Sequence, residues 1–398
     1  MNEEQKQVFD LAISGKNVFI TGGGGVGKSY TLENIITYLA KINKKHGVTA
    51  TTGSAAYLIG GTTINSFLGI KVKLSNIDKK VKQLKTSKKD KYKRLKELET
   101  LIIDEISMMN DEFFTYISDY LKKIKNNDAP FGGVQIILCG DLYQMPPCSG
   151  SYFIKSNVWQ ELEMNIKELV FSHRQKGHDE FRILLERIRK GKWDEEIVQT
   201  LLKCNKNKKL PNATILFSTN KNVDYINNKK LDALIKKNNE VKEYPPKVIK
   251  KSIYTDYDLA PLRLCKGVKV MLTHNIDTDM GLCNGAKGVV KSMQSNDVTV
   301  TFDHNVTIDI PYTNVYDEDD NHIMAIMPLR LAYAITINKC QGMTLNNVVL
   351  WLDDFAVFKE NYGRLYTALS RVRSIDNLQI VGKIKKSYFD IHEDLKSI

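Results

Sequence analysis

The chain has 398 residues with 42% hydrophobic and 26% charged side chains, which is typical of a soluble globular protein and sufficient for two or three domains with hydrophobic cores. No run of 18 apolar residues occurs, and residues 1–5 are polar and acidic, so neither a membrane span nor a secretory signal nor an Arg-rich transit peptide is expected. The formal net charge of +12 favours a polyanionic partner, most simply nucleic acid, although a Lys/Asn-rich translation bias would give the same surplus.

The cysteines do not form a metal-binding pattern. None of the six lies in a C-x-x-C pair or at zinc-ligand spacing from one of the seven histidines, which argues against a metal cluster. We therefore expect free thiols and an intracellular protein, in the cytoplasm of a bacterium or of a virus-infected host or in a nucleus. The six residues are Cys139, Cys148, Cys204, Cys265, Cys283 and Cys340.

A glycine-rich loop follows the first predicted strand. Residues 17–21 (NVFIT) predict a buried strand, and residues 28–42 predict a helix. The loop between them, residues 22–29 (GGGGVGKS), matches the pattern G-x-x-x-x-G-K-[ST]. Its glycines would let backbone N–H groups surround phosphate oxygens without Cβ clashes, and the helix N-terminus adds partial positive charge. The loop therefore predicts a nucleotide site rather than the alternative, a flexible turn.

The residues of this loop have distinct expected roles. Lys28 should reach the β and γ phosphates of ATP, and the Ser29 hydroxyl should bind Mg²⁺. The expected nucleotide contacts in this segment are Gly22, Gly23, Gly24, Gly25, Val26, Gly27, Lys28, Ser29 and Tyr30.

The next part of the chain leads into a strongly charged stretch. Residues 48–52 predict a strand, and a helix of small residues is expected after Gly53. Residues 71–99 are mostly Lys, Asp, Glu and Leu, which predicts a short helical insert. The insert is either a solvated connector or a wedge or arm that contacts nucleic acid.

Polar residues end two further predicted strands. After residues 101–103 (LII), Asp104 can hold the water shell of Mg²⁺, and Glu105 can orient or deprotonate the attacking water. After residues 135–138 comes the sequence GDLYQMPP, in which Gln144 is placed to sense the γ phosphate and the prolines stiffen the turn. The alternative for this segment is a purely structural turn.

A second set of predicted strands lies in the C-terminal half. Residues 213–218, 331–336, 348–352 and 378–381 are apolar runs, and strands of this kind alternating with helices predict parallel sheets. Between the first two runs the sequence has short strand-like segments separated by Gly or Asn/Asp turns. This pattern predicts a small barrel inserted into a second lobe. Its expected strands are residues 268–273, 286–291, 298–302 and 306–310.

Two arginines expected in the second lobe are candidates for the hydrolytic site. They are Arg174, in the sequence FSHRQ, and Arg371, in the sequence ALSRVR. A planar guanidinium can stabilise the charge that phosphoryl transfer spreads over the γ-phosphate oxygens. The alternative for each arginine is a surface salt bridge.

These motifs, in this order, resemble those of the Pif (petite integration frequency) DNA helicases, in the 5′-to-3′ branch of superfamily 1 and related to RecD and the phage helicase Dda. The most family-specific stretch is PFGGVQ at residues 130–135. The other matching segments are residues 2–5, 22–29, 61–67 (GTTINSF), 104–107 (DEIS), 140–147, 284–288, 336–344 (TINKCQGMT) and 366–373.

The resemblance implies an α/β fold of two RecA-like parallel-sheet lobes with ATP between them and single-stranded DNA across their top. A small wedge would be inserted in the first lobe and a small β-barrel in the second. The implied boundaries are 1–70 and 98–165 for the first lobe, 71–97 for the wedge, 166–232 and 326–398 for the second lobe, and 233–325 for the inserted domain. The implied protein is a monomeric 5′-to-3′ motor that uses ATP and Mg²⁺ on single-stranded DNA and tailed duplex DNA.

The resemblance also implies contacts with the adenine and with the strand. Gln5 would read the adenine, and Gly342 would lie at the nucleotide. Hydroxyl and amide groups suit a motor that must grip phosphates and release them, while Phe67 is either a stacking residue or a core residue. The threonines are alternatively ordinary strand residues. The expected DNA contacts are Thr51, Thr52, Thr63, Asn65, Phe67, Thr336, Asn338, Lys339 and Thr344.

Asn65 and Asn338 depart from the family pattern, which usually has His at the first position and often at the second. Asn keeps a hydrogen bond but loses the flat ring that could stack on a base. Two other activities are compatible with the motifs, namely an RNA-stimulated helicase of the same superfamily and a nucleic-acid-binding NTPase switch that does not unwind. The motifs do not discriminate among replication, repair, recombination and telomere maintenance.

Overall fold

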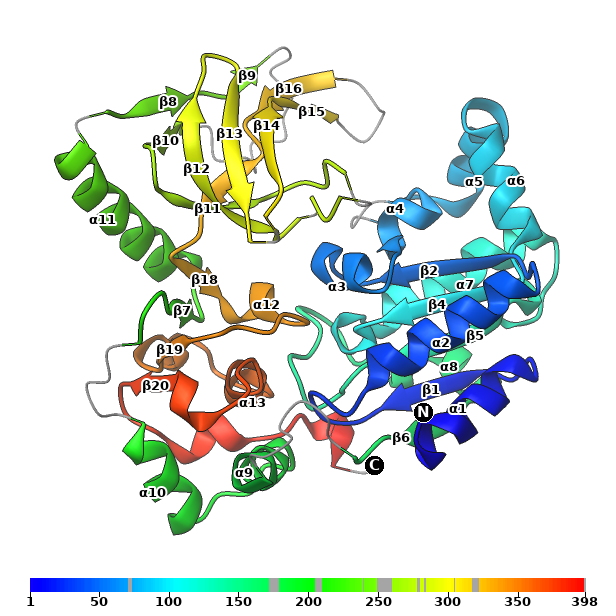
Figure 1. Ribbon diagram of the computed structural model, residues 1–398. Coiled ribbons are helices and arrows are strands. Elements are labelled where there is room, and N and C mark those ends of the chain that lie inside the picture. Colours follow the sequence, from blue (N-terminus) through cyan, green and yellow to red (C-terminus); the bar gives the residue numbers. More distant parts are fainter. Residues whose placement is uncertain are drawn as a thin grey trace. The chain divides into compact units, whose positions relative to one another are not determined.

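The computed structural model describes residues 1–70, 74–171, 179–204, 210–238, 240–248, 260–277, 280–282, 284–303, 305–316 and 322–396. The chain divides into two compact units, the first of Met1–Pro211 with Cys340–Ile398 and the second of Asn212–Lys339 (Figure 1). Among the described helices, none combines the length and the apolar character that a bilayer crossing requires.

A six-stranded parallel sheet forms the centre of the first unit. Its order is β3-β2-β4-β5-β1-β6, with β1 next to β5. Strands β4 and β5 are buried along their whole length because helices cover both faces of the sheet (Figure 1). The strands are β1 (Val18–Thr21), β2 (His46–Ala50), β3 (Thr62–Thr63), β4 (Thr100–Asp104), β5 (Gln135–Cys139) and β6 (Asn165–Glu168).

Alternating side chains of this sheet enter two hydrophobic clusters. Val18 and Ile20 pack with helices α1 and α2 on one face, and Phe19 packs with helix α7 on the other. This is the period of two that a pleated strand requires. The α-helices that precede or connect the strands are α1 (Glu3–Ile13), α2 (Lys28–Lys41), α3 (Gly53–Leu58), α4 (Ile64–Leu68), α5 (Ile77–Ser87), α6 (Lys89–Glu97), α7 (Asp111–Lys125) and α8 (Asn157–Glu161).

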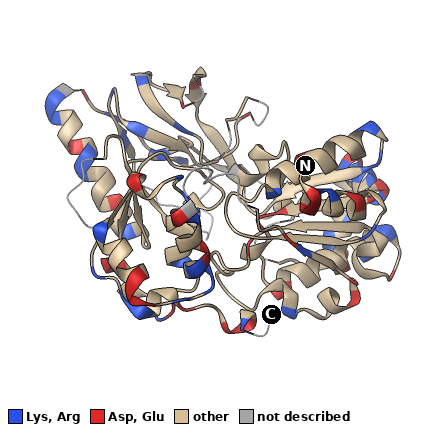
Figure 2. Ribbon diagram, turned by 60° about the horizontal axis from the view of Figure 1, so that its bottom comes forward, with Lys and Arg blue, Asp and Glu red and all other residues tan. Residues whose placement is uncertain are grey.

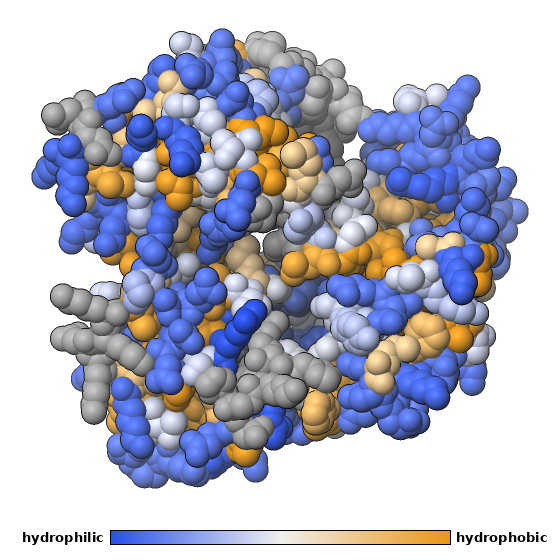
Figure 3. Space-filling model, in the orientation of Figure 1, coloured by the Kyte–Doolittle hydropathy of each residue, from blue (hydrophilic) through white to orange (hydrophobic). Residues whose placement is uncertain are grey.

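Helices α5 and α6 are the charged insert predicted from the sequence. Val81, Leu84 and Leu95 of these two helices are buried in the core, with Ile77 and Tyr92 partly buried against it, and a Lys123–Asp78 ion pair of 2.7 Å connects α5 to α7. The remaining surface is hydrophilic in Figure 3. Residues 71–73, at the start of the predicted insert, lie outside the described residues.

The rest of the first unit supplies two parallel strands and three helices. Strand β19 (Val348–Trp351) pairs with β20 (Leu378–Val381). The C-terminal segment then packs against the hydrophobic cluster that contains Phe19 and α7. There Leu395 is buried, and an Asp394 carboxylate oxygen accepts the Tyr152 N–H at 3.2 Å. The α-helices are α9 (Asp179–Arg189), α10 (Glu195–Lys203) and α13 (Arg364–Leu369). The 3₁₀ helices of this unit are η1 (Ile106–Met108), η2 (Pro130–Gly133), η3 (Phe153–Lys155), η4 (Asp353–Val357), η5 (Ile375–Asn377), η6 (Lys386–Phe389) and η7 (Glu393–Leu395).

The second unit combines parallel strands with antiparallel sheets, as predicted. Strand β7 (Thr214–Phe217) pairs in parallel with β18 (Ala334–Thr336), and α11 (Asn220–Asn238) packs against both. The predicted all-β region is a five-stranded antiparallel sheet of order β14-β13-β12-β11-β17. Its strands are β11 (Lys269–Leu272), β12 (Lys287–Met293), β13 (Asp297–Phe302), β14 (Thr307–Pro311) and β17 (Leu329–Leu331).

Smaller elements complete this unit. They are the pair β8 (Lys242–Tyr244) and β10 (Leu262–Leu264), the sheet of β9 (Lys247–Val248), β15 (Thr313–Tyr316) and β16 (His322–Ile326), and the helix α12 (Ile337–Cys340) at its C-terminal border.

The strand predicted at residues 331–336 is two strands. Strand β17 ends at Leu331 and β18 begins at Ala334. The buried Asn227 side chain donates to the carbonyl oxygens of Leu331 and Ala334 at 3.2 and 3.1 Å and accepts the Ala334 N–H at 2.8 Å. A side chain from α11 thus replaces the ladder bonds of a continuous strand, and the prediction was wrong at this point.

Candidate active site

The glycine-rich loop lies between β1 and α2, as predicted. Gly25 and Gly27 both have φ of +87°, which an L side chain rarely adopts, and a Cβ on Gly22 would lie 2.3 Å from the Leu169 carbonyl oxygen. The Lys28 ammonium donates to the carbonyl oxygens of Gly22 and Gly23 at 2.7 and 2.9 Å. The loop is therefore curled around the lysine that would bind phosphate.

A cavity of about 520 Å³ adjoins this loop. Its volume suits a ligand of the size of a nucleotide. The predicted residues Lys28, Asp104 and Glu105 line it together with Gln144 and Arg371. The full lining is Gly24, Gly25, Gly27, Lys28, Ser29, Tyr30, Asp104, Glu105, Gln144, Gly342, Thr344, Arg371 and Arg373. Thr344, predicted as a DNA contact, thus lies at the nucleotide cavity, and Arg373 was not predicted there.

The two carboxylates stand at the end of β4. Asp104 is 6% exposed, and burial, followed by the neighbouring Glu105 charge, raises its pKa from 3.8 to about 6, against the opposing effect of Lys28. The Glu105 backbone is left-handed, with φ of +52°, and its N–H donates to an Asp104 carboxylate oxygen at 2.8 Å. Two adjacent carboxylates beside the Ser29 hydroxyl are oxygen ligands of the kind that Mg²⁺ prefers.

Protein side chains supply only part of such a coordination shell. Within the described ranges no group of three or more His, Cys, Asp or Glu side chains could hold a metal ion. A Mg²⁺ ion would therefore be held by Ser29 and Asp104 together with waters and nucleotide phosphates, which is its usual mode of binding.

Three buried glutamines among the described residues have a side-chain atom without a hydrogen-bond partner. They are Nε2 of Gln5, Oε1 of Gln144 and Oε1 of Gln341. Leaving such an atom unsatisfied costs roughly 1–3 kcal/mol, so each is a candidate contact for a ligand. Oε1 of Gln5 accepts the Asn2 N–H at 2.9 Å in the capping box that begins α1. Gln144 lines the cavity, whereas Gln5 does not.

Arg371 lies at the cavity just after α13, and its guanidinium is held by hydrogen bonds within the protein. It is 2% exposed and donates to the Thr367 carbonyl oxygen at 2.9 Å, to the Ser370 hydroxyl at 2.7 Å and to the Met343 carbonyl oxygen at 3.3 Å. Arg174, the other predicted arginine, lies outside the described residues.

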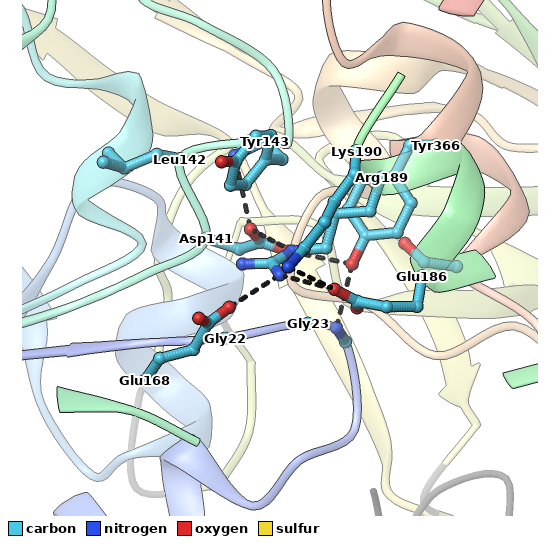
Figure 4. A network of polar contacts seen from close by, with 12 residues as sticks. Gly22, Gly23, Asp141, Leu142, Tyr143, Glu168, Glu186, Arg189, Lys190 and Tyr366 are labelled. Carbon is cyan, nitrogen blue, oxygen red and sulfur yellow. Dashed lines mark hydrogen bonds and ion pairs between the residues drawn. The ribbon is translucent and has the colours of Figure 1, made fainter. Parts of the chain in front are cut away.

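Sequence reasoning missed a buried network beside the loop (Figure 4). Asp141 is fully buried and accepts hydrogen bonds from the Arg189 guanidinium at 3.0 Å and from the Tyr366 hydroxyl at 2.8 Å. The Tyr366 hydroxyl in turn accepts the Gly24 N–H at 3.1 Å. Asp141 and Tyr366 stand in the quoted motifs, whereas Arg189 has no local signal.

Gln341 was also missed. Its side-chain amide donates to the Glu105 carboxylate at 3.1 Å and to the Ser107 hydroxyl at 2.9 Å, and Gln341 is 1% exposed. The candidate water-orienting group is thus fixed by a residue that follows α12.

The predicted DNA contacts of the first lobe also have roles in the fold. Thr51 donates from its hydroxyl to the Glu105 carbonyl oxygen at 2.7 Å, and Thr52 and Thr63 cap α3 and α4. Phe67 is 8% exposed and lies in the hydrophobic core with the Arg94 guanidinium 4.5 Å from its ring centroid, which matches the core alternative.

The remaining predicted DNA contacts lie in or beside short helices. Asn65 is in α4, Thr336 ends β18, and Asn338 and Lys339 are in α12. Their contact with DNA stays a prediction.

Comparison with known proteins gives consistent matches. The model of the family PIF1-like helicase matches residues 1–199, and that of the DNA helicase Pif1 2B domain matches residues 260–293. Protein 030L of Invertebrate iridescent virus 6 is 29% identical over 100% of this chain and 95% of its own. The ATP-dependent DNA helicases PIF1 of Xenopus laevis and Pif1 of Bdellovibrio bacteriovorus are 33% and 31% identical over 96% of this chain. The chain spans 61% of the frog relative and 88% of the bacterial one.

Solved structures agree with the fold over the whole chain. Pif1 helicase from Candida albicans superposes with a TM-score of 0.87 at 28% identity, covering 100% of this chain and 97% of that one. Bacteroides Pif1 in complex with ADP-AlF3 and single-stranded DNA gives 0.84 at 28% identity, covering 100% and 96%. These likenesses confirm the predicted α/β fold with two RecA-like lobes and an antiparallel insert.

Proposed function

Because the chain belongs to the PIF1-like helicase family, we propose that it is an ATP-dependent DNA helicase that moves 5′ to 3′ on single-stranded DNA and unwinds duplex DNA as a monomer. The observation that supports this most is the single cavity at which the phosphate-binding loop meets two carboxylates, Gln144 and Arg371. The lobe and insert boundaries given above are part of the proposal.

Each of these cavity residues has a separate role in the hydrolysis of ATP. Lys28 and the loop amides hold the β and γ phosphates. Ser29 and Asp104 would hold a Mg²⁺ ion, which would neutralise phosphate charge. Glu105 orients the attacking water and accepts its proton. Gln144 contacts the γ phosphate, and Arg371, joined by Arg174, stabilises the charge that develops on it.

Movement along DNA requires contacts that repeat with each nucleotide. The hydroxyl and amide side chains proposed to contact the strand reach phosphate and sugar, which carry no base sequence. Relatives described as bound to single-stranded DNA and as acting on forked duplex DNA support this choice of substrate. Asn65 and Asn338 provide hydrogen bonds there without base stacking.

Strand displacement tests the proposal. The protein should unwind a duplex with a 5′ single-stranded tail and not one with a 3′ tail, and Lys28→Ala should abolish ATP hydrolysis while retaining DNA binding. Unwinding of only the 3′-tailed duplex would contradict the polarity, and full activity of Lys28→Ala would remove the loop from the site. Stronger stimulation of hydrolysis by poly(U) than by poly(dT) would indicate an RNA-directed motor instead.

A further inference from the structure

The buried network in Figure 4 connects the phosphate-binding loop to four other elements, yet the hydrolysis described above does not use it. Asp141 follows β5, Glu168 ends β6, Arg189 ends α9 and Tyr366 lies in α13. Asp141, Arg189 and Tyr366 are exposed by 0, 2 and 4%. Buried polar side chains whose hydrogen bonds are satisfied hold the surrounding elements in one arrangement.

The Tyr366 hydroxyl is oriented by its two partners. It has one hydrogen, which it donates to Asp141 at 2.8 Å, so a lone pair remains for the Gly24 N–H at 3.1 Å. Burial, followed by the Asp141 charge, raises the pKa of Tyr366 well above 10, against the opposing effect of Arg189. The hydroxyl therefore stays protonated and keeps this orientation at every pH at which the protein would work.

Arg189 fixes the carboxylate that orients the tyrosine. Its Nε donates to Asp141 at 3.0 Å, and its Nη1 donates to Glu168 at 2.8 Å and to Glu186 at 3.1 Å. The guanidinium also lies 4.6 Å from the centroid of the Tyr143 ring. A planar, multiply bonded guanidinium leaves Asp141 little freedom to turn.

The phosphate-binding loop has unusually large conformational freedom, so contacts from outside the loop are needed to fix its backbone. Residues 22–25 are four consecutive glycines, and glycine loses more conformational freedom on ordering than any other residue. Gly24 lines the nucleotide cavity, so fixing its amide fixes part of the wall that would surround the phosphates. A Cβ on Gly23 would lie 3.4 Å from the Tyr366 hydroxyl oxygen, so the tyrosine packs against the loop as well as bonding to it.

We propose that Tyr366 is a positioning residue for the phosphate-binding loop, and that Asp141 and Arg189 act on the loop through its hydroxyl. This inference rests on the proposed function, because it explains how the site would bind ATP tightly and therefore requires that ATP is the ligand. Ordering the loop before ATP arrives lowers the entropic cost of binding, so the network acts on the KM for ATP more than on kcat. Asp141 also accepts the Gln144 N–H at 3.0 Å on its own carbonyl oxygen, which joins the loop to the turn that carries the γ-phosphate contact.

Tyr366→Phe tests the proposal with Tyr120→Phe as the matched control. Tyr120 is also buried and donates its hydroxyl to one backbone oxygen, that of Leu68 at 3.2 Å, but it contacts no part of the loop. We expect Tyr366→Phe to raise the KM for ATP about 10-fold in single-stranded-DNA-stimulated hydrolysis, with kcat within about threefold of wild type. Tyr120→Phe should lower the Tm and leave the KM unchanged. An unchanged KM in Tyr366→Phe would overturn the proposal.

A double-mutant cycle tests the route through the hydroxyl. In Asp141→Asn the side-chain amide would donate to the tyrosine oxygen instead of accepting from it, so this variant alone should also raise the KM. If Asp141 acts through Tyr366, the double variant should have the KM of Tyr366→Phe alone, whereas additive effects would show independent action and overturn that step. If one variant fails to fold, Arg189→Lys, which cannot bridge the same acceptors, takes its place in the cycle.

Hydrogen exchange provides a readout that does not depend on hydrolysis. The Gly24 amide should exchange faster in nucleotide-free Tyr366→Phe than in wild type, and the Kd for ADP should rise about as much as the KM. A wild-type protein without DNA-stimulated hydrolysis would contradict the proposed function, while exchange and ADP binding would still test the loop. Equal Gly24 exchange in both proteins would contradict the inference alone.

Discussion

At the scale of single residues, Asp104 shows a cost that the candidate site imposes on the fold. A buried carboxylate whose folded-state pKa rises from 3.8 to about 6 binds a proton more readily when folded than when unfolded. Its contribution to stability therefore falls as pH rises through this window, and at pH 7.5 the ionised group destabilises the fold by about 3 kcal/mol. Repulsion from Glu105 beside it is part of this cost.

We therefore predict that Asp104→Asn is more stable than wild type by about 1–3 kcal/mol at pH 7.5, measured by urea unfolding in EDTA, and inactive in hydrolysis. The asparagine oxygen can still accept the Glu105 N–H, so this bond of the fold is kept. The gain should shrink at pH 4, where the wild-type carboxyl is protonated. An equal or lower stability of the variant at pH 7.5 would show that the buried charge is compensated.

The same scale shows what the sequence could not predict. Lys28, Asp104 and Gln144 could be predicted because each belongs to a short sequence motif that follows a predicted strand. Each of them lines the cavity. Arg189 lies at the end of an amphipathic helix, where an arginine usually faces solvent, and only tertiary packing places it on a buried carboxylate. Phe67 had two equal interpretations because stacking on a base and packing in a core select the same side chain.

At the scale of elements, most strands predicted from continuous apolar runs agree with the structure to within two residues at each end, and the run at residues 331–336 is the exception. Strand β20 matches residue for residue, and β1 and β5 differ by one residue at an end. Strand β6 was missed because its burial alternates along four residues that include Asn165 and Glu168, so it lacks an apolar run. The split between β17 and β18 depends on Asn227, which lies 104 residues from Leu331 along the chain.

The segment after α12 supports a prediction at this scale. Asn338 and Lys339, proposed DNA contacts, precede Gln341 in sequence, and Gln341 holds Glu105. Gln341→Ala should lower single-stranded-DNA-stimulated kcat about 10–100-fold with little change in the KM for ATP, because the water-orienting carboxylate loses its donor. Pre-steady-state and steady-state hydrolysis with and without oligo(dT) would measure this change.

Gln135→Ala is the matched control for Gln341→Ala. Gln135 is also buried, and its amide donates to the carbonyl oxygens of Ala12 and Lys16 at 2.7 and 2.8 Å, away from the cavity. It should lower the Tm and preserve the ratio of stimulated to unstimulated hydrolysis. A Gln341→Ala protein with the wild-type ratio would show that Glu105 is positioned without Gln341.

At the scale of the whole molecule, the formal net charge of +12 is spread over many elements rather than being confined to one helix or strand. Lys and Arg are interspersed with Asp and Glu along the helices visible in Figure 2. A mixed distribution of this kind gives weak attraction to any polyanion, so the proposed hydroxyl and amide contacts would have to fix the position of the strand. Coupling between DNA and nucleotide therefore has to come from particular side chains.

Arg371 is the side chain best placed to carry that coupling. It lines the nucleotide cavity and donates to the Met343 carbonyl oxygen, which lies between Gly342 at the cavity and Thr344. The affinity of ADP-AlF4⁻ should rise about 10-fold in the presence of oligo(dT), and the affinity of oligo(dT) should rise by the same factor with ADP-AlF4⁻, because coupling between two binding sites is reciprocal.

The Arg371→Ala protein should bind both ADP-AlF4⁻ and oligo(dT) but fail to hydrolyse ATP. Each ligand should then leave the affinity of the other almost unchanged. Fluorescence anisotropy of labelled oligo(dT) and calorimetric titration of ADP-AlF4⁻ would measure the four affinities in each protein. In this variant no guanidinium connects the cavity wall to the Met343 carbonyl oxygen. Loss of coupling should therefore accompany loss of turnover. Retention of a 10-fold coupling in an inactive Arg371→Ala protein would show that the arginine serves the chemistry alone and that another route connects the strand to the nucleotide.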